Sequence, residues 1–95
     1  MHYLFAKIDG GWHLAGCHNK VDDENGLLAL YINAFLYIRV VCNDIPVQRK
    51  GEELLAYYMR VLSTKTFIYK VIEVNSIREG IEQLKIDKVV GIDIR

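Results

Sequence analysis

The sequence has little of what usually marks a chemical function. It holds one proline, two cysteines and three histidines in 95 residues, and its basic and acidic residues balance to a net charge of zero. The single proline and seven glycines argue against a linker-like or low-complexity chain. A balanced charge argues against the strongly basic face of most nucleic-acid-binding domains. No apolar run reaches the ~18 residues that a membrane-spanning helix needs.

Targeting and disulfide signals are missing as well. The segment from Met1 to Asp9 has no basic start, no long apolar stretch and no small-residue cleavage site, so we expect a cytoplasmic protein without a secretory signal. Cys17 and Cys42 are too few for a disulfide framework, and we expect both to be free thiols packed as small apolar side chains.

What the sequence does have is an excess of apolar residues. They make up 52% of the chain, and six of them are tyrosines. A domain of this length buries only roughly 60–65% of its unfolded surface when it folds alone. The remaining apolar side chains must lie on the surface, where contiguous patches usually mark contact sites. The composition therefore favours a protein that acts by binding.

The first half of the chain predicts a β-hairpin and a long helix. The runs 3–8 and 12–17 flank Asp9-Gly10-Gly11, whose residues tolerate the positive φ angles of a tight turn. The acidic residues 22–24 suit a helix N-terminus, and apolar residues recur at helical spacing from 27 onward, nearly all round the helix. We expect the helix to end near Leu36 and a strand to cover 39–42, although strands throughout 27–42 would also fit the pattern.

The second half predicts two more helices and two more strands. A helix is expected over 52–62, with one apolar stripe and with Tyr57 and Arg60 facing away from it, and then a strand over 66–74. Ser76 and Glu79 match a capping box at the start of a short helix, and 89–94 is a terminal strand. The prediction is a single α+β domain over 1–95, a two-layer sandwich with a mixed sheet and helices mainly on one face.

No catalytic, metal or cofactor site is predicted. His13, Cys17 and His18 are metal-ligand types with loose spacing, and no second pair follows them. No glycine-rich phosphate loop is present, and the paired carboxylates lie where helix N-termini are expected. An enzyme stays a third hypothesis, which would depend on folding to assemble His13, Cys17, His18 and Asp93.

Residues 3–35 run from a strand through Asp9-Gly10-Gly11 to a strand ending at Gly16-Cys17, an acidic turn and a helix. This order resembles the N-terminal half of HicB-type antitoxins. The stretch after Cys17 lacks the Gly-Asp-Thr pattern usual there, and 45–95 matches no DNA-binding tail. The resemblance covers about a third of the chain and assigns no site residue; it implies only that an antitoxin-like regulator is one alternative.

Our first functional hypothesis is a small regulator or inhibitor, of the kind found in phages and mobile elements. It would act as a homo-oligomer, with a dimer expected, and bind another protein. Its predicted contact residues are Leu30, Tyr31, Tyr37, Tyr57 and Tyr58, some of which must instead be core. The alternative is an antitoxin- or repressor-like nucleic-acid-binding regulator that uses the most basic segment, 49–70. Its predicted contact residues are Arg49, Lys50, Arg60, Lys65 and Lys70.

Overall fold

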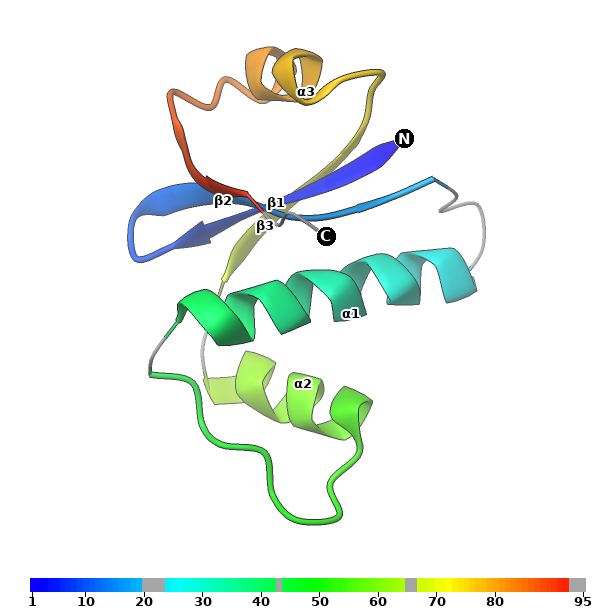
Figure 1. Cartoon of the computed structure of the whole chain (residues 1–95), viewed down its shortest axis with the longest axis vertical. Helices are drawn as coiled ribbons and strands as arrows, with labels where there is room; N and C mark the ends of the chain where they lie inside the picture. The colour runs from blue at the N-terminus through cyan, green and yellow to red at the C-terminus, as the bar shows by residue number, and fades with distance from the viewer. Residues whose placement is uncertain (20–23, 43, 65–66, 93–95) are drawn as a thin grey trace.

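The structure is a computed structural model of the chain that describes residues 1–19, 24–42, 44–64 and 67–92. Its elements are, in order, β1 (His2–Ile8), β2 (Gly11–His18), α1 (Glu24–Val41), α2 (Leu54–Thr64), β3 (Ile68–Glu73), α3 (Ile77–Gln83) and β4 (Val89–Ile92). The four strands form one mixed sheet in the order β3-β1-β2-β4 (Figure 1). β1 is antiparallel to both of its neighbours, and β4 is parallel to β2. The predicted α+β fold with a mixed sheet is confirmed.

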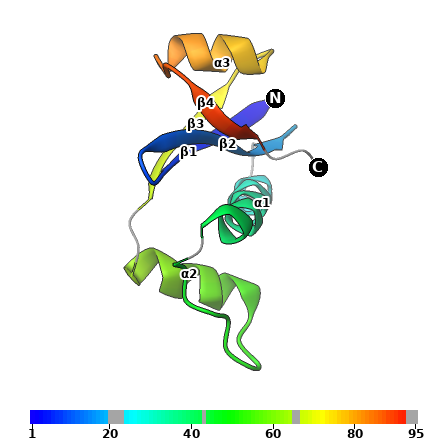
Figure 2. The same ribbon diagram turned by 60° about the vertical axis from the view of Figure 1, so that its left-hand side comes forward.

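The helices lie on both sides of this sheet. α1 covers one face, and α2 lies on the far side of α1, away from the strands (Figure 2). α3 covers the opposite face, so the helices mainly occupy one side and α3 adds a layer on the other. None of the three helices, over the residues that the structure describes, has the length and hydropathy needed to cross a membrane.

The hairpin forms where the sequence predicts it. Ile8 pairs with Gly11, which leaves Asp9 and Gly10 as a two-residue turn. Their φ angles are 50° and 82°, both in the left-handed region that this kind of turn requires. An aspartate followed by glycine adopts this conformation at little cost, and that is why the local sequence is sufficient to specify it.

Strand β2 contains a bulge that the sequence did not reveal. Leu4 pairs with Gly16 and Phe5 with Leu14, so Ala15 is an extra residue with no partner on β1. Ala15 and Gly16 both lie toward α1, and a Cβ on Gly16 would meet the backbone of α1 at 3.4 Å. Two small residues in succession let the helix approach the sheet closely.

The prediction of a strand over 39–42 is wrong, because α1 continues to Val41. Ala34, Ile38 and Cys42 are buried at helical spacing against the sheet, and the Cys42 amide donates to the Ile38 carbonyl at 2.9 Å. α1 and α2 are therefore consecutive helices. The strand that follows them, β3, pairs antiparallel with β1.

Helix α2 is displaced by two residues from its predicted range and is rotated. Tyr57, Tyr58 and Val61 are buried, whereas Leu55 is 43% exposed. The expectation that Tyr57 faces away from the packed stripe is wrong. The Tyr57 hydroxyl donates to the Pro46 carbonyl, which satisfies the one polar group of a ring that is otherwise packed in the core.

Helix α3 begins as its capping box predicts. The Glu79 amide donates to the Ser76 Oγ at 3.2 Å, and the Glu79 carboxylate accepts from the amide of Asn75, one residue before the usual partner. Gly80 is buried in this helix, and a Cβ there would approach the Phe5 ring at 3.3 Å. Close packing of α3 on the sheet explains a glycine that disfavours the helix by about 1 kcal/mol.

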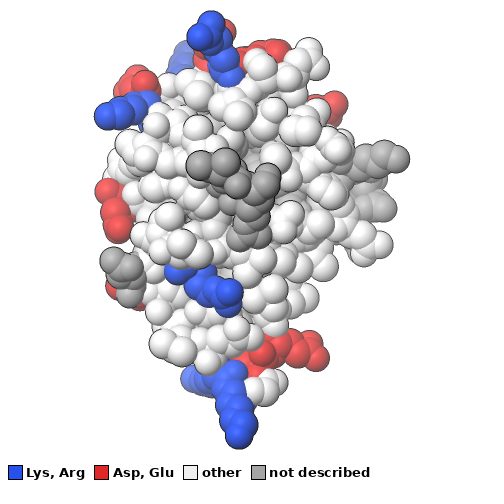
Figure 3. All heavy atoms as spheres, viewed as in Figure 1, with Lys and Arg blue, Asp and Glu red and all other residues white. Residues whose placement is uncertain are grey.

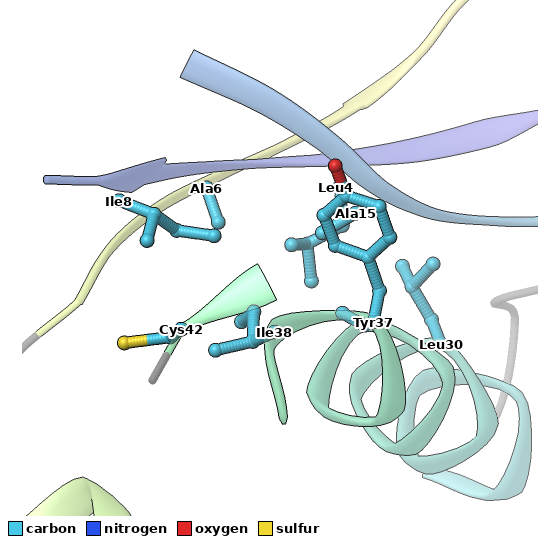
Figure 4. Packing of buried hydrophobic residues seen from close by; sticks show 9 residues of the cluster. Leu4, Ala6, Ile8, Ala15, Leu30, Tyr37, Ile38 and Cys42 are labelled. Carbon is cyan, nitrogen blue, oxygen red and sulfur yellow. The ribbon is translucent and has the colours of Figure 1, made fainter. Parts of the chain in front are cut away.

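Three groups of buried side chains hold the layers together. Leu4, Ala6 and Ile8 of β1 pack against α1 (Figure 4), and Tyr3 and Phe5 pack on the α3 side of the sheet. Phe35 of α1 packs between Tyr57 and Tyr58 of α2. Tyr3, Tyr37, Tyr57 and Tyr58 are all buried, so most of the tyrosine excess belongs to the core. Burial raises the pKa of Tyr58, and it raises that of Tyr69 well above its usual range.

Candidate interaction surface

Four of the five predicted contact residues lie in the core and offer no surface. Leu30, Tyr37, Tyr57 and Tyr58 are at most 8% exposed. Tyr31 is half-buried, and its ring meets that of Tyr69 edge-on at 6.2 Å. These four are the members of the predicted set that belong to the core, and Tyr31 is the one that stays partly exposed. The physical reason is that α1 packs against the sheet on one side and against α2 on another, which uses its aromatic residues internally.

A third side of α1 faces away from both the sheet and α2, among the residues that the structure describes. Leu28, Ile32, Leu36 and Val40 recur every fourth residue and form a stripe that we call the outer face of α1. Leu28 is 38% exposed and Val40 76%, and the two residues between them are partly exposed. None of the four belongs to a core cluster of the described residues. The spacing of these four residues can be read from the sequence. Because the helix is apolar nearly all round, however, the sequence does not show which of its sides stays uncovered.

The outer face of α1 carries almost no charge. From 25 to 41 the helix has one charged residue, Arg39, in its last turn. On the molecular face that α1 crosses in Figure 1, most of the charged side chains of described residues lie near the rim, and one basic side chain lies nearer the middle (Figure 3). An apolar surface without charges favours contact with another apolar surface over contact with an ionic ligand.

The residues of the enzyme hypothesis are not brought together. His13 pairs with Ala6 on the α1 side of the sheet, whereas Cys17 pairs with Tyr3 on the α3 side. Regular alternation would put both on one face, and the bulge at Ala15 reverses that. No group of three metal-ligand side chains occurs among the residues that the structure describes. Asp93 lies outside them.

His13 has a structural environment. Its Nδ1 lies 2.8 Å from the Tyr37 hydroxyl oxygen, and the two rings are tilted, with centroids 5.7 Å apart. Burial lowers the pKa of His13, and the nearby Asp9 carboxylate opposes that shift. Gly91 of β4 lies against both side chains, so this pair positions the edge strand on α1.

The two cysteines also differ in their surroundings. Cys17 is exposed, and Cys42 is buried at the end of α1, where its Sγ donates to the Asp44 carboxylate at 2.9 Å. Both are free thiols.

The basic residues of the nucleic-acid hypothesis are also dispersed. Arg49 and Lys50 are exposed in the loop before α2, and Lys65 lies outside the described residues. Lys70 is on β3, where its Nζ lies 5.2 Å from the centroid of the Trp12 ring. Arg60 is used within the fold. It forms a two-pronged ion pair with Glu52, both bonds 2.9 Å long, and donates to the Val47 carbonyl.

The Arg60–Glu52 pair predicts a specific pH dependence. Hydrogen bonds from Arg60, and then from the Arg49 amide, lower the pKa of Glu52 from 4.5 to about 2. Because the folded pKa lies below the unfolded one, this stabilisation is complete above pH 4.5 and is lost as the pH falls toward 2. We expect Glu52→Gln to flatten the pH dependence of the free energy of unfolding in that window, measured by urea denaturation.

An NMR titration of the Glu52 carboxyl carbon checks the same prediction directly, with an expected midpoint near 2. Glu53→Gln removes the same charge one residue away, at an exposed position, and is the matched control. A Glu52 midpoint at the ordinary glutamate value would show that the pair does not form in solution.

Three comparisons with known proteins add no relative. No protein-family model, no curated protein and no solved structure matches the chain. A functional proposal for this protein must therefore come from its own surfaces.

Proposed function

We propose that this chain acts by binding rather than by catalysis, and that it does so as a homodimer assembled through the outer face of α1. The dimer would present the remaining surface to a protein partner, as a small regulator or inhibitor does. The observation that supports this proposal is an apolar stripe without charged residues on a helix whose other sides pack against the sheet and against α2.

The stripe has the size and shape of a helix-packing surface. From Leu28 to Val40 it extends about 18 Å along the helix axis, at 1.5 Å per residue. Residues spaced by four form a single ridge, and two such ridges pack at a crossing angle of about −50°. Ile32 and Leu36 would then lie at the centre of the contact, with Leu28 and Val40 at its two ends.

A second copy of the chain suits this surface because the stripe is self-complementary. A two-fold axis near the middle of the stripe makes the two copies of α1 antiparallel and places Ile32 of each near Leu36 of the other. The two Arg39 side chains would then be separated by about 15 Å along the axis, whereas a parallel pair would bring them together. The small Ala29 and the short Asn33 beside the stripe permit a close approach.

Light scattering behind a sizing column tests the proposal. The wild type should have the mass of a dimer, about 22 kDa for two 11.0 kDa chains, at low and at high salt, since burial of apolar surface is little affected by screening. Leu36→Lys should give a monomer, because the two-fold axis would bring two lysines close together. Lysine is a good helix former, so α1 itself should persist.

Two variants control for this change. Leu36→Met keeps the apolar volume and should remain a dimer, while Val47→Lys adds the same charge at a loop residue that is 85% exposed and should also remain one. Circular dichroism verifies that each variant is folded. A monomeric wild type at micromolar concentrations, or a Leu36→Lys protein that is still a dimer, would contradict the proposal.

A further inference from the structure

A second surface, on the opposite side of the sheet, has a different chemistry. A cavity of about 270 Å³ lies between the hairpin turn and the segment that joins α3 to β4. Trp12 is on the α3 side of the sheet, packed with Val89, and lines this cavity. The other lining residues are Lys7, Gly10, Gly11, Lys85, Asp87, Lys88 and Val90.

Positive charge is concentrated around the cavity. Lys7, Lys85 and Lys88 line it, and Lys70 lies over the Trp12 ring. The ion pairs formed among the described residues involve none of these four lysines, although Asp87 also lines the cavity. In a chain with a net charge of zero, this grouping puts a third of the 12 basic residues at one site. Such a grouping attracts anionic ligands.

The backbone at Lys85 has a left-handed conformation, and its residue lines the cavity. The Lys85 amide donates to the Glu82 carbonyl and the Ile86 amide to the Ile81 carbonyl, the two bonds of a Schellman motif at the end of α3. The residue at this position takes a left-handed conformation, here with φ of 56°, and glycine is the usual choice. A lysine at such a position is less stable than glycine would be, and it places a cation at the cavity.

We propose that this cavity is a binding site for single-stranded nucleic acid. One base would stack on Trp12, and Lys7, Lys85 and Lys88 would pair with the phosphates on either side of it. Aromatic rings that hold bases beside cations that follow the backbone are the usual elements of single-strand binding. The segment of highest basic content, 49–70, contributes only Lys70, so the site differs from the one that the sequence predicted.

The size of the cavity favours a polymer over a free small molecule. Small-molecule sites usually enclose about 300–1,000 Å³, and this open cavity has about 270 Å³. The cavity can hold one base or one phosphate group. The lysines around it cover a wider area than one such group would occupy. A duplex is excluded as the primary ligand because its bases are stacked on one another and cannot reach Trp12.

The chemistry also favours nucleic acid over an acidic protein segment. Carboxylate side chains would pair with the lysines as phosphates do, but they would not stack on the Trp12 ring. A base stacks on the ring, and its amino groups can donate to the Asp87 carboxylate. The cavity and the outer face of α1 lie on opposite sides of the sheet, so this site does not depend on the dimer.

Trp12 provides the measurement, since it is the single tryptophan of the chain. Titration with a short oligodeoxythymidylate at low salt should quench its fluorescence in a saturable manner. Three phosphate contacts predict that the logarithm of the binding constant falls with the logarithm of salt with a slope of about −2. From 50 to 200 mM salt, the affinity should therefore fall roughly 15- to 20-fold.

Lys85→Gly is the decisive variant, because it should weaken binding and stabilise the protein. Losing one phosphate contact should reduce the affinity about fivefold at 0.1 M salt and make the slope shallower by about 0.7. The thermal midpoint should rise, since glycine suits the left-handed position, so that weaker binding cannot be attributed to unfolding. Lys50→Gly, at an exposed loop position before α2, removes the same charge and should change neither slope nor affinity.

Several results would overturn the assignment. Absence of quenching at low salt, or an unchanged affinity in Lys85→Gly, would exclude a phosphate contact at this cavity. Equal competition by a polyglutamate peptide would show that the site takes acidic protein segments instead. Equal affinity for thymidine monophosphate and for the oligonucleotide would show that it is a site for a small anionic ligand.

Discussion

Phe35→Ala should lower the free energy of unfolding by about 3–5 kcal/mol, a large share of the ~5–15 kcal/mol that a domain has. Phe35 is 1% exposed, and its ring lies 5.2 Å from that of Tyr57 and 4.9 Å from that of Tyr58. It belongs to α1, and its two ring partners belong to α2, so its removal leaves a cavity at the contact between the helices. Urea denaturation monitored by circular dichroism measures the loss.

The same experiment should show which part of the molecule opens first. α2 packs on α1 and lies away from the sheet, whereas Trp12 reports on the α3 side of the sheet. In Phe35→Ala we therefore expect the helical signal to be lost at lower urea than the change in tryptophan fluorescence. Leu55→Ala, at an exposed position of α2, is the control and should change the stability little. A loss below about 1 kcal/mol in Phe35→Ala would contradict this account of the α1–α2 contact.

Gly91→Ala should have the second largest effect, about 1–3 kcal/mol, because it adds volume where none is free. A Cβ at Gly91 would overlap the Tyr37 hydroxyl and the His13 ring, which are held together by their own hydrogen bond. Either β4 must move away from β2 or the His13–Tyr37 pair must separate. Thermal or urea denaturation measures the loss, and an NMR titration should show the pKa of His13 returning toward its ordinary value as the ring becomes solvated.

Val90→Ala is the matched control for this substitution. Val90 precedes Gly91 on the same edge strand and is 53% exposed, so shortening it should change the stability by no more than about 0.5 kcal/mol. If Gly91→Ala were as stable as Val90→Ala, the edge strand would not be packed against Tyr37 in solution.

The parts of the fold that depend on neighbouring residues could be predicted from the sequence. The Asp9-Gly10 turn and the Ser76 cap each depend on hydrogen bonds or φ angles within a few residues. The strand character of β3 follows likewise from its own β-branched and aromatic residues. These features were sufficient for the α+β class and for a mixed sheet.

The predictions that were wrong concern which side of a helix packs against its neighbours. Residues 39–42 have β-branched residues typical of a strand, yet burial of Ile38 and Cys42 at helical spacing extends α1. Tyr57 is polar enough to be assigned to the surface, but the Pro46 carbonyl accepts its hydroxyl and the ring is buried. Both outcomes depend on the packing of α1 against the sheet and against α2. The local sequence pattern does not specify that packing.

The candidate surfaces show the same division. The outer face of α1 is visible in the spacing of its residues, but the tyrosines beside it were chosen because tyrosine is frequent at interfaces. The lysines around Trp12 come from three separate parts of the chain, at 7, 70 and 85–88. They come together only because β1 pairs with β3 and because α3 packs beside them. A count of basic residues along the sequence cannot detect such a group, and it selected the segment 49–70 instead.

The position of β1 at the centre of the sheet has a consequence for biosynthesis. β1 is made first and can pair with β2 at once, whereas its other neighbour is β3, with His2 opposite Glu73, roughly 70 residues later. On the ribosome the hairpin therefore has two open edges, on β1 until β3 has emerged and on β2 until β4 has emerged. An open edge of this kind recruits foreign strands, so the slow step of folding coincides with the time when the nascent chain most needs protection from aggregation.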